Sequence, residues 1–109
     1  MYLDKQCELE FKENKSSIIG YLLAASWIYY HREHMTPILS DELFDKLCKW
    51  VYKHYDSLEH KYKHLINKDD LLAGSLFSIG SYDYPRGLCI AAEMMSEGKV
   101  NFNIEKEDL

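Results

Sequence analysis

The strongest constraint on the fold is an apolar stripe that recurs every three or four residues between positions 44 and 65. This spacing places side chains on one face of an α-helix. Ser40 precedes the stripe as an N-cap, and Asp41 and Glu42 follow in the first turn, where the helix dipole favours carboxylates. We therefore predict a long helix over 41–65. Its apolar positions are Phe44, Leu47, Cys48, Val51, Tyr55, Leu58, Tyr62 and Leu65.

The same spacing predicts three further helices. The first begins at Asn14 or Ser16 and ends between 31 and 34, before the connector 36–39, where a proline interrupts helical geometry. Another covers 67–79, and the last begins at 83 or 84 and continues to 95, with Gly98 as its stop signal. Apolar and polar residues alternate over 7–12 and 100–105, which predicts two short paired strands. The predicted fold class is mainly α, a small four-helix domain with a minor two-stranded β element.

Length, charge and cysteine content exclude several classes of protein. A chain of 109 residues forms one domain and cannot hold separate cofactor and substrate domains. Its net charge of −5 argues against non-specific binding to nucleic acid. Three widely spaced cysteines predict buried, reduced thiols. With no membrane-spanning apolar run and no signal peptide in view, we expect a cytoplasmic protein without membrane contacts.

The connector 36–39, together with the helix ends on either side of it, resembles a known family. It reads Tyr30-His31, then Pro37-Ile38, then Asp41-Glu42-Leu43-Phe44-Asp45-Lys46-Leu47. This pattern resembles the N-terminal helical hairpin, domain Ia, of bacterial NAD-dependent DNA ligases, in which a Tyr-His pair ends one helix and Asp-x-Glu-Tyr-Asp opens the next. The resemblance covers about residues 20–65.

In that family the hairpin binds the nicotinamide mononucleotide half of NAD. The resemblance therefore implies that Tyr30 and His31 contact the nicotinamide and that Asp41 and Asp45 accept hydrogen bonds from ribose or carboxamide groups. Phe44 stands where the family has tyrosine. This chemistry is reasonable in itself, because a flat cationic pyridinium favours an aromatic face and nearby carboxylates. In the alternative, purely structural interpretation, the two aromatic residues belong to the interior and Asp45 is a solvated first-turn carboxylate.

The chain departs from the family in two places that bear on function. The stretch from His31 to Pro37 is one residue longer than the usual spacing, and we place the extra residue in the loop, since loops absorb insertions. Without this gap, His31 and Arg32 would occupy the Tyr-His positions. Adenylating ligases also need a Lys-x-Asp-Gly motif, and the nearest string, Lys68-Asp69-Asp70-Leu71, lacks the glycine. No nucleophile–base pair stands out either. We therefore expect a non-catalytic module that binds NAD or nicotinamide mononucleotide, or that modulates an NAD-using process.

A second hypothesis places function on a protein-binding surface. Small, acidic, tyrosine-rich chains without catalytic motifs are typical of phage-encoded inhibitors or adaptors that act on a host or defence protein, an analogy only. The partner-binding residues would be Tyr82, Tyr84 and Arg86. A lysine-rich face that includes Lys49 and Lys53 could instead meet an acidic partner. His60 and His64 have zinc-ligand spacing, but the lysines beside them favour an exposed basic face. The sequence predicts no particular oligomeric state.

Overall fold

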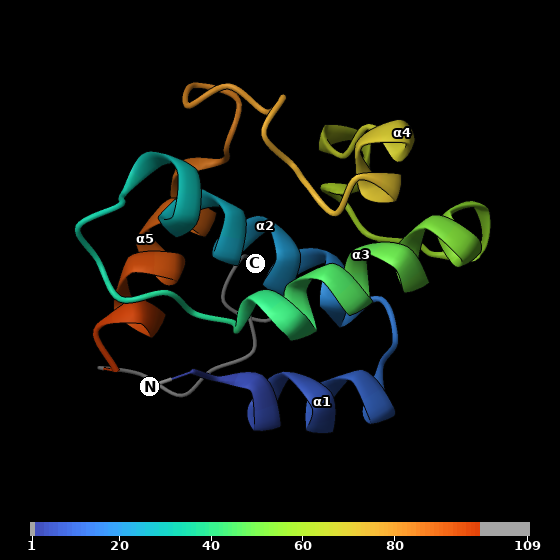
Figure 1. Ribbon diagram of the computed structural model, residues 1–109, viewed down its shortest axis with the longest axis horizontal. Helices are drawn as coiled ribbons and strands as arrows, with labels where there is room; N and C mark the ends of the chain where they lie inside the picture. The colour runs from blue at the N-terminus through green and yellow to red at the C-terminus, as the bar shows by residue number, and fades with distance from the viewer. Residues whose placement is uncertain (1, 99–109) are drawn as a thin grey trace.

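One buried helix organises the molecule. The computed structural model describes residues 2–98, and in it α2 (Ser17–His31) runs through the centre (Figure 1). Three helices pack against α2, namely α1 (Asp4–Glu13), α3 (Asp41–His54) and α5 (Arg86–Ser96). The short α4 (Lys68–Leu72) packs on α3 instead. The predicted mainly α class is confirmed.

The central helix is apolar on all sides because its neighbours surround it. Every residue from 17 to 26 is buried, including Gly20 and Ser26. A helix buried all round needs no polar face, so its sequence lacks the one-sided pattern of a surface helix. Its predicted start near Ser16 and end at His31 are confirmed. No helix within residues 2–98 combines the length and the apolar character that crossing a membrane requires.

The predicted strand over 7–12 is wrong, because these residues belong to α1. A second period is visible once Leu3 is included: Leu3, Cys7 and Phe11 recur every four residues, and these three pack into the core. Leu9, which an alternating strand would bury, is 58% exposed. The hydroxyl of Tyr21 binds Glu10 across the α1–α2 contact. The predicted partner strand, 100–105, lies outside the described residues.

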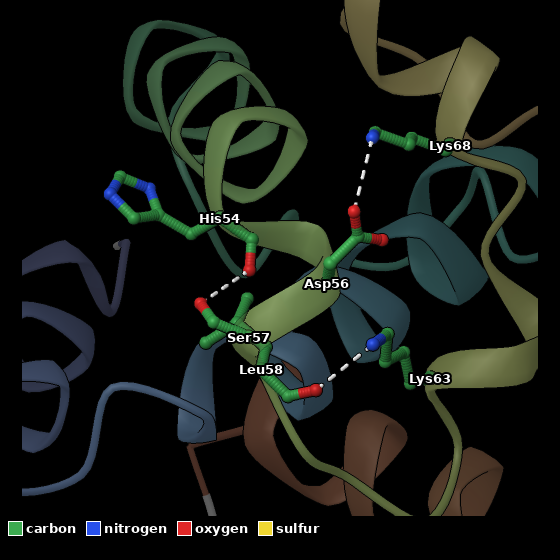
Figure 2. Close-up of polar contacts among 6 residues, drawn as sticks. All are labelled: His54, Asp56, Ser57, Leu58, Lys63 and Lys68. Atoms are coloured by element: carbon green, nitrogen blue, oxygen red, sulfur yellow. Dashed lines mark hydrogen bonds and ion pairs between the residues drawn. The ribbon is translucent and has the colours of Figure 1, made fainter.

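The long predicted helix over 41–65 ends early, at His54, and two short 3₁₀ turns follow: η1 (Tyr55–Ser57) and η2 (Lys63–Leu65). Side-chain hydrogen bonds add to the backbone hydrogen bonds of these turns. Figure 2 shows the Ser57 hydroxyl donating to the His54 carbonyl at 2.9 Å and the Lys63 ammonium donating to the Leu58 carbonyl at 3.0 Å. Because 3₁₀ turns also bring every third residue to one side, Leu58 still reaches the core.

The predicted helix over 67–79 is also shorter, because α4 ends at Leu72. Asn67 caps it as expected, accepting a hydrogen bond from the Asp69 amide. Gly74 then takes φ +67°, and the amides of Gly74 and Ser75 donate to the carbonyls of Leu71 and Asp70. This pair of bonds is a Schellman closure, which a glycine permits at low cost. The chain is then free to run back to the end of α2.

The last helix agrees with its prediction to within a few residues. α5 begins at Arg86, after Pro85, rather than at 83 or 84, and it ends at Ser96. Gly98 takes φ +69° just beyond it, so the predicted stop signal is confirmed.

The cysteines of α1 and α3 are core residues, as predicted. Cys7 and Cys48 have no exposed surface, and burial raises the pKa of each thiol to about 12. Cys89 in α5 is only half-buried, which corrects the prediction of three buried thiols, and burial raises its pKa as well. Because the thiolate is the reactive form of cysteine, the burial of Cys7 and Cys48 is typical of structural thiols.

Candidate functional site

Four of the five residues predicted to bind a cofactor line one cavity. We call it the hairpin cavity, and it has a volume of about 260 Å³. It lies where the last turn of α2, the connector and the first turns of α3 meet, next to the loop after α4. The predicted residues in its wall are Tyr30, Asp41, Phe44 and Asp45. The remaining wall residues are Ala25, Tyr29, Pro37, Ile38, Leu39 and Gly74.

His31, the fifth predicted residue, is not part of this wall. Successive residues of a helix point about 100° apart, so His31 faces the segment 79–84 that precedes α5 while Tyr30 faces the cavity. The His31 ring packs against Trp27 and Tyr84, with ring centres 5.3 and 5.4 Å away. Its Nε2 lies 3.2 Å from the Ile79 carbonyl oxygen. His31 therefore holds the loop after α4 and does not contact the cavity.

Tyr30 is held in place from two sides. Its hydroxyl lies 3.2 Å from Ser75 Oγ, which also accepts a hydrogen bond from the Phe77 amide. Its ring meets the Tyr29 and Phe77 rings edge to face, at 5.1 and 5.4 Å between centres. Edge-to-face geometry is the arrangement that aromatic rings favour. The Tyr30 ring is thus positioned before any ligand arrives.

The start of α3, which presents the two aspartates, is fixed by α1. Ser40 caps α3 by accepting a hydrogen bond from the Leu43 amide at 3.2 Å. The Ser40 backbone amide donates to Asp4 Oδ1 at 2.9 Å, and the Ser40 hydroxyl donates to Asp4 Oδ2. This double contact sets where the first turn of α3 begins, and therefore where Asp41 and Asp45 lie.

The two carboxylates of the cavity differ in their partners. Asp45 is half-buried and forms an ion pair with Lys49 at 2.9 Å. The Asp41 side chain is exposed and forms no hydrogen bond or ion pair with any residue from 2 to 98. Lys49 therefore balances one of the two charges, and the wall keeps a net negative charge beside the rings of Tyr30 and Phe44. Such a wall suits a flat ligand that carries positive charge.

Gly74, in the loop after α4, completes the wall of the hairpin cavity. A Cβ atom at this position would collide with Asp45 Oδ1, so the backbone approaches the carboxylate as closely as a residue without a side chain allows. The sequence reasoning above missed Gly74, Ser75 and Tyr29. An isolated glycine after an apolar run was the available signal for Gly74.

The residues predicted for a protein interface are not alike in exposure. Tyr82 is fully exposed and Arg86 is exposed, as an interface would require. Tyr84 is only 5% exposed, and its hydroxyl lies 2.8 Å from Ser26 Oγ inside the core. Tyr84 is therefore a packing residue, which corrects its placement on a surface loop. Burial also raises the pKa of Tyr84 to about 12.

The predicted lysine face is divided by the early end of α3. Lys49 and Lys53 are exposed on α3, and Lys49 is paired with Asp45. Lys61 and Lys63, expected on the same helix, follow it instead. Lys63 lies over the Tyr55 ring, 4.5 Å from its centre. Figure 2 shows Lys68 facing Asp56, with 3.9 Å between the ammonium nitrogen and a carboxylate oxygen. Lys63 and Lys68 therefore stabilise the turns after α3.

The histidines of this region take part in local contacts. His54 stacks on Trp50 at 4.1 Å, and its Nδ1 lies 2.9 Å from the Trp50 carbonyl oxygen. His60 accepts a hydrogen bond from the Tyr62 amide at 3.1 Å. Within residues 2–98, no group of three or more His, Cys, Asp or Glu side chains is arranged to hold a metal ion.

Comparison of the chain with protein-family models, with curated proteins and with solved structures gives no match.

Proposed function

We propose that the hairpin cavity binds the nicotinamide end of a nicotinamide nucleotide, NAD or nicotinamide mononucleotide. The observation that carries the proposal is the convergence of Tyr30, Asp41, Phe44 and Asp45 on one cavity. Of the five residues chosen from the resemblance to the ligase hairpin, only His31 lies elsewhere.

The chemistry of the wall supports an oxidised, cationic ring. The rings of Tyr30 and Phe44 offer apolar surface on which a pyridinium can stack, and an aromatic face attracts positive charge. Asp41 has no competing cation among residues 2–98, so its carboxylate is available to a ligand. Asp45 can accept a hydrogen bond from a carboxamide or ribose hydroxyl while it keeps its ion pair with Lys49. The reduced, neutral ring would lose the charge attraction.

The size of the cavity limits how much of the ligand it holds. Small-molecule sites usually measure about 300–1,000 Å³, and the hairpin cavity, at about 260 Å³, is slightly smaller than this range. It suits the ring and its ribose but not a complete dinucleotide. The chain would then carry or sense the nicotinamide end, and any chemistry on the nucleotide would fall to a partner, in keeping with its lack of a Lys-x-Asp-Gly motif.

Calorimetric titration with nicotinamide mononucleotide tests this proposal. We expect saturable binding that Asp41→Ala and Asp45→Ala each weaken about tenfold, the loss of one charge-assisted contact. Glu42→Ala is the matched control, because it removes a carboxylate from the same first turn of α3 without touching the cavity. The absence of heat at millimolar ligand, or equal losses for Asp41→Ala and Glu42→Ala, would contradict the proposal.

A second candidate function is supported by the full exposure of Tyr82. In this alternative the chain is a protein-binding inhibitor or adaptor of the phage type, and it meets its target through Tyr82 and Arg86. Tyr and Arg side chains commonly supply most of the binding energy at interfaces. Native mass spectrometry of the chain purified from its own host tests this. A defined complex that Tyr82→Ala dissolves and Asp41→Ala leaves intact is expected, and a complex insensitive to Tyr82→Ala argues against it.

A further inference from the structure

A second cavity adjoins the hairpin cavity and shares Tyr29, Tyr30 and Pro37 with it. We call it the outer cavity, and it has a volume of about 480 Å³. Its own wall residues include Glu33, Met35 and Phe77. None of these three was singled out by the sequence, and none contributes to the proposed nicotinamide site.

Three aromatic rings meet nearly at right angles in the wall of the outer cavity. The planes of Tyr29 and Tyr30 differ by 85°, and those of Tyr30 and Phe77 differ by 73°. Phe77 is 72% exposed and Tyr29 is 54% exposed. Exposed apolar surface of this kind is unfavourable in water, so a ligand that covers it gains free energy.

Glu33 adds an unbalanced negative charge to these rings. It is exposed, and its carboxylate forms no ion pair with any residue from 2 to 98. Arg32, the cation next to it in sequence, lies 3.2 Å from Glu93 on α5. The outer cavity therefore combines aromatic walls with a carboxylate that no residue from 2 to 98 neutralises.

We propose that the outer cavity binds an alkylated ammonium group, of the kind carried by choline or by trimethyllysine. Such a group has positive charge, an apolar surface and no hydrogen-bond donor to satisfy. Aromatic rings beside a carboxylate are suited to it, because the face of a ring attracts a cation and the carboxylate supplies the opposite charge. A primary ammonium is more strongly hydrated and gains less from this wall.

Titration with tetramethylammonium, followed in backbone amide NMR spectra, tests the proposal. We expect saturable shifts at Glu33 and Phe77, and an affinity that Phe77→Ala and Glu33→Gln each reduce about three- to tenfold. Tyr82→Ala is the matched control, because it removes an exposed aromatic ring that lies outside this cavity, and it should leave the affinity unchanged. Neopentyl alcohol, a neutral molecule of similar shape, should bind much more weakly.

Two results would overturn the proposal. Equal binding of neopentyl alcohol would mean that the cavity is merely apolar, and an unchanged affinity in Phe77→Ala would place the ammonium elsewhere. Comparing choline with a short trimethyllysine peptide then identifies the source: tighter binding of the peptide points to a protein side chain, and equal binding to a small molecule. Asp41→Ala keeps this test separate from the nicotinamide site, because Asp41 lines only the hairpin cavity.

Discussion

Gly74 both adopts a left-handed backbone conformation and lines the hairpin cavity. Its φ of +67° is costly for any residue with a side chain, by roughly 1–2 kcal/mol. A side chain would also collide with Asp45. We expect Gly74→Ala to lower the free energy of unfolding by about 2–3 kcal/mol and to weaken ligand binding, as measured by urea denaturation and calorimetry.

Gly98→Ala provides a matched control for this prediction. Gly98 has nearly the same backbone angle, φ +69°, but no atom lies within 4 Å of the position of an added Cβ. Its substitution therefore reports the conformational cost alone. Equal losses of stability in the two variants would show that Asp45 does not press against Gly74.

Single residues of the site could be predicted only where the sequence fixes the direction of the side chain. Asp41 and Asp45 are four apart on a well-capped helix, so a shared face follows from the helical repeat. Tyr30 and His31 are neighbours on a helix, so the same helical repeat predicts that their side chains point in different directions. Ser75 and Phe77 could not be found, because they reach Tyr30 through a loop whose path depends on tertiary contacts.

At the scale of elements, the contact between α1 and the start of α3 can be tested by substitution of a single residue, Asp4. Asp4 accepts two hydrogen bonds from Ser40, one from the amide and one from the hydroxyl. Asp4→Ala leaves both donors without this partner, so we expect it to reduce the free energy of unfolding by about 1–3 kcal/mol. Weaker nicotinamide binding should accompany the loss, since α3 carries Asp41 and Asp45.

Glu8→Ala is the control, because Glu8 is an exposed carboxylate on the same helix and no hydrogen bond or ion pair joins its side chain to residues 2–98. Urea denaturation of both variants measures the difference. If Asp4→Ala and Glu8→Ala destabilise equally, the contact with Ser40 does not position α3.

The helices were predictable as elements, and their lengths were not. The caps Ser40 and Asn67 act locally, so they marked the starts of α3 and α4 correctly. The steps of three and four beyond His54 persist in 3₁₀ turns, so the pattern could not distinguish these turns from a continued helix. In 7–12, alternation over six residues competed with a four-residue period that becomes visible only when Leu3 is included.

At the scale of the whole molecule, the burial of ionisable groups makes the free energy of unfolding depend on pH. Burial raises the pKa of Cys7 and Cys48 from 9.0 to about 12, and that of Tyr84 from 10.0 to about 12. The folded state therefore holds these protons more tightly than the unfolded state. Their contribution to stability is complete below about pH 9 and is lost as the pH rises from 9 toward 12.

Urea denaturation at neutral pH and at pH 11 measures this loss. We expect the free energy of unfolding to fall between the two, and to fall less in Tyr84→Phe, which no longer has a phenol to ionise. Tyr84→Phe also loses its contact with Ser26, so each variant is compared with itself at neutral pH. Stability that rises with pH above 9 would contradict the prediction.

Taken as a whole, the chain presents two adjoining cavities at one end of its central helix, both lined by aromatic rings and carboxylates. Both cavities lie where α2, the connector and the loop after α4 come together, and the hairpin cavity also borders α3. The central claim is that the hairpin cavity takes the nicotinamide ring between Tyr30 and Phe44.

Nuclear Overhauser contacts between nicotinamide mononucleotide and the protein test that claim most directly. The account predicts contacts from the pyridinium ring protons to the aromatic protons of Tyr30 and Phe44, and weaker contacts in Asp41→Ala at a ligand concentration near the Kd of the unsubstituted chain. Contacts to Tyr82 instead, or no contacts at saturating ligand, would contradict it.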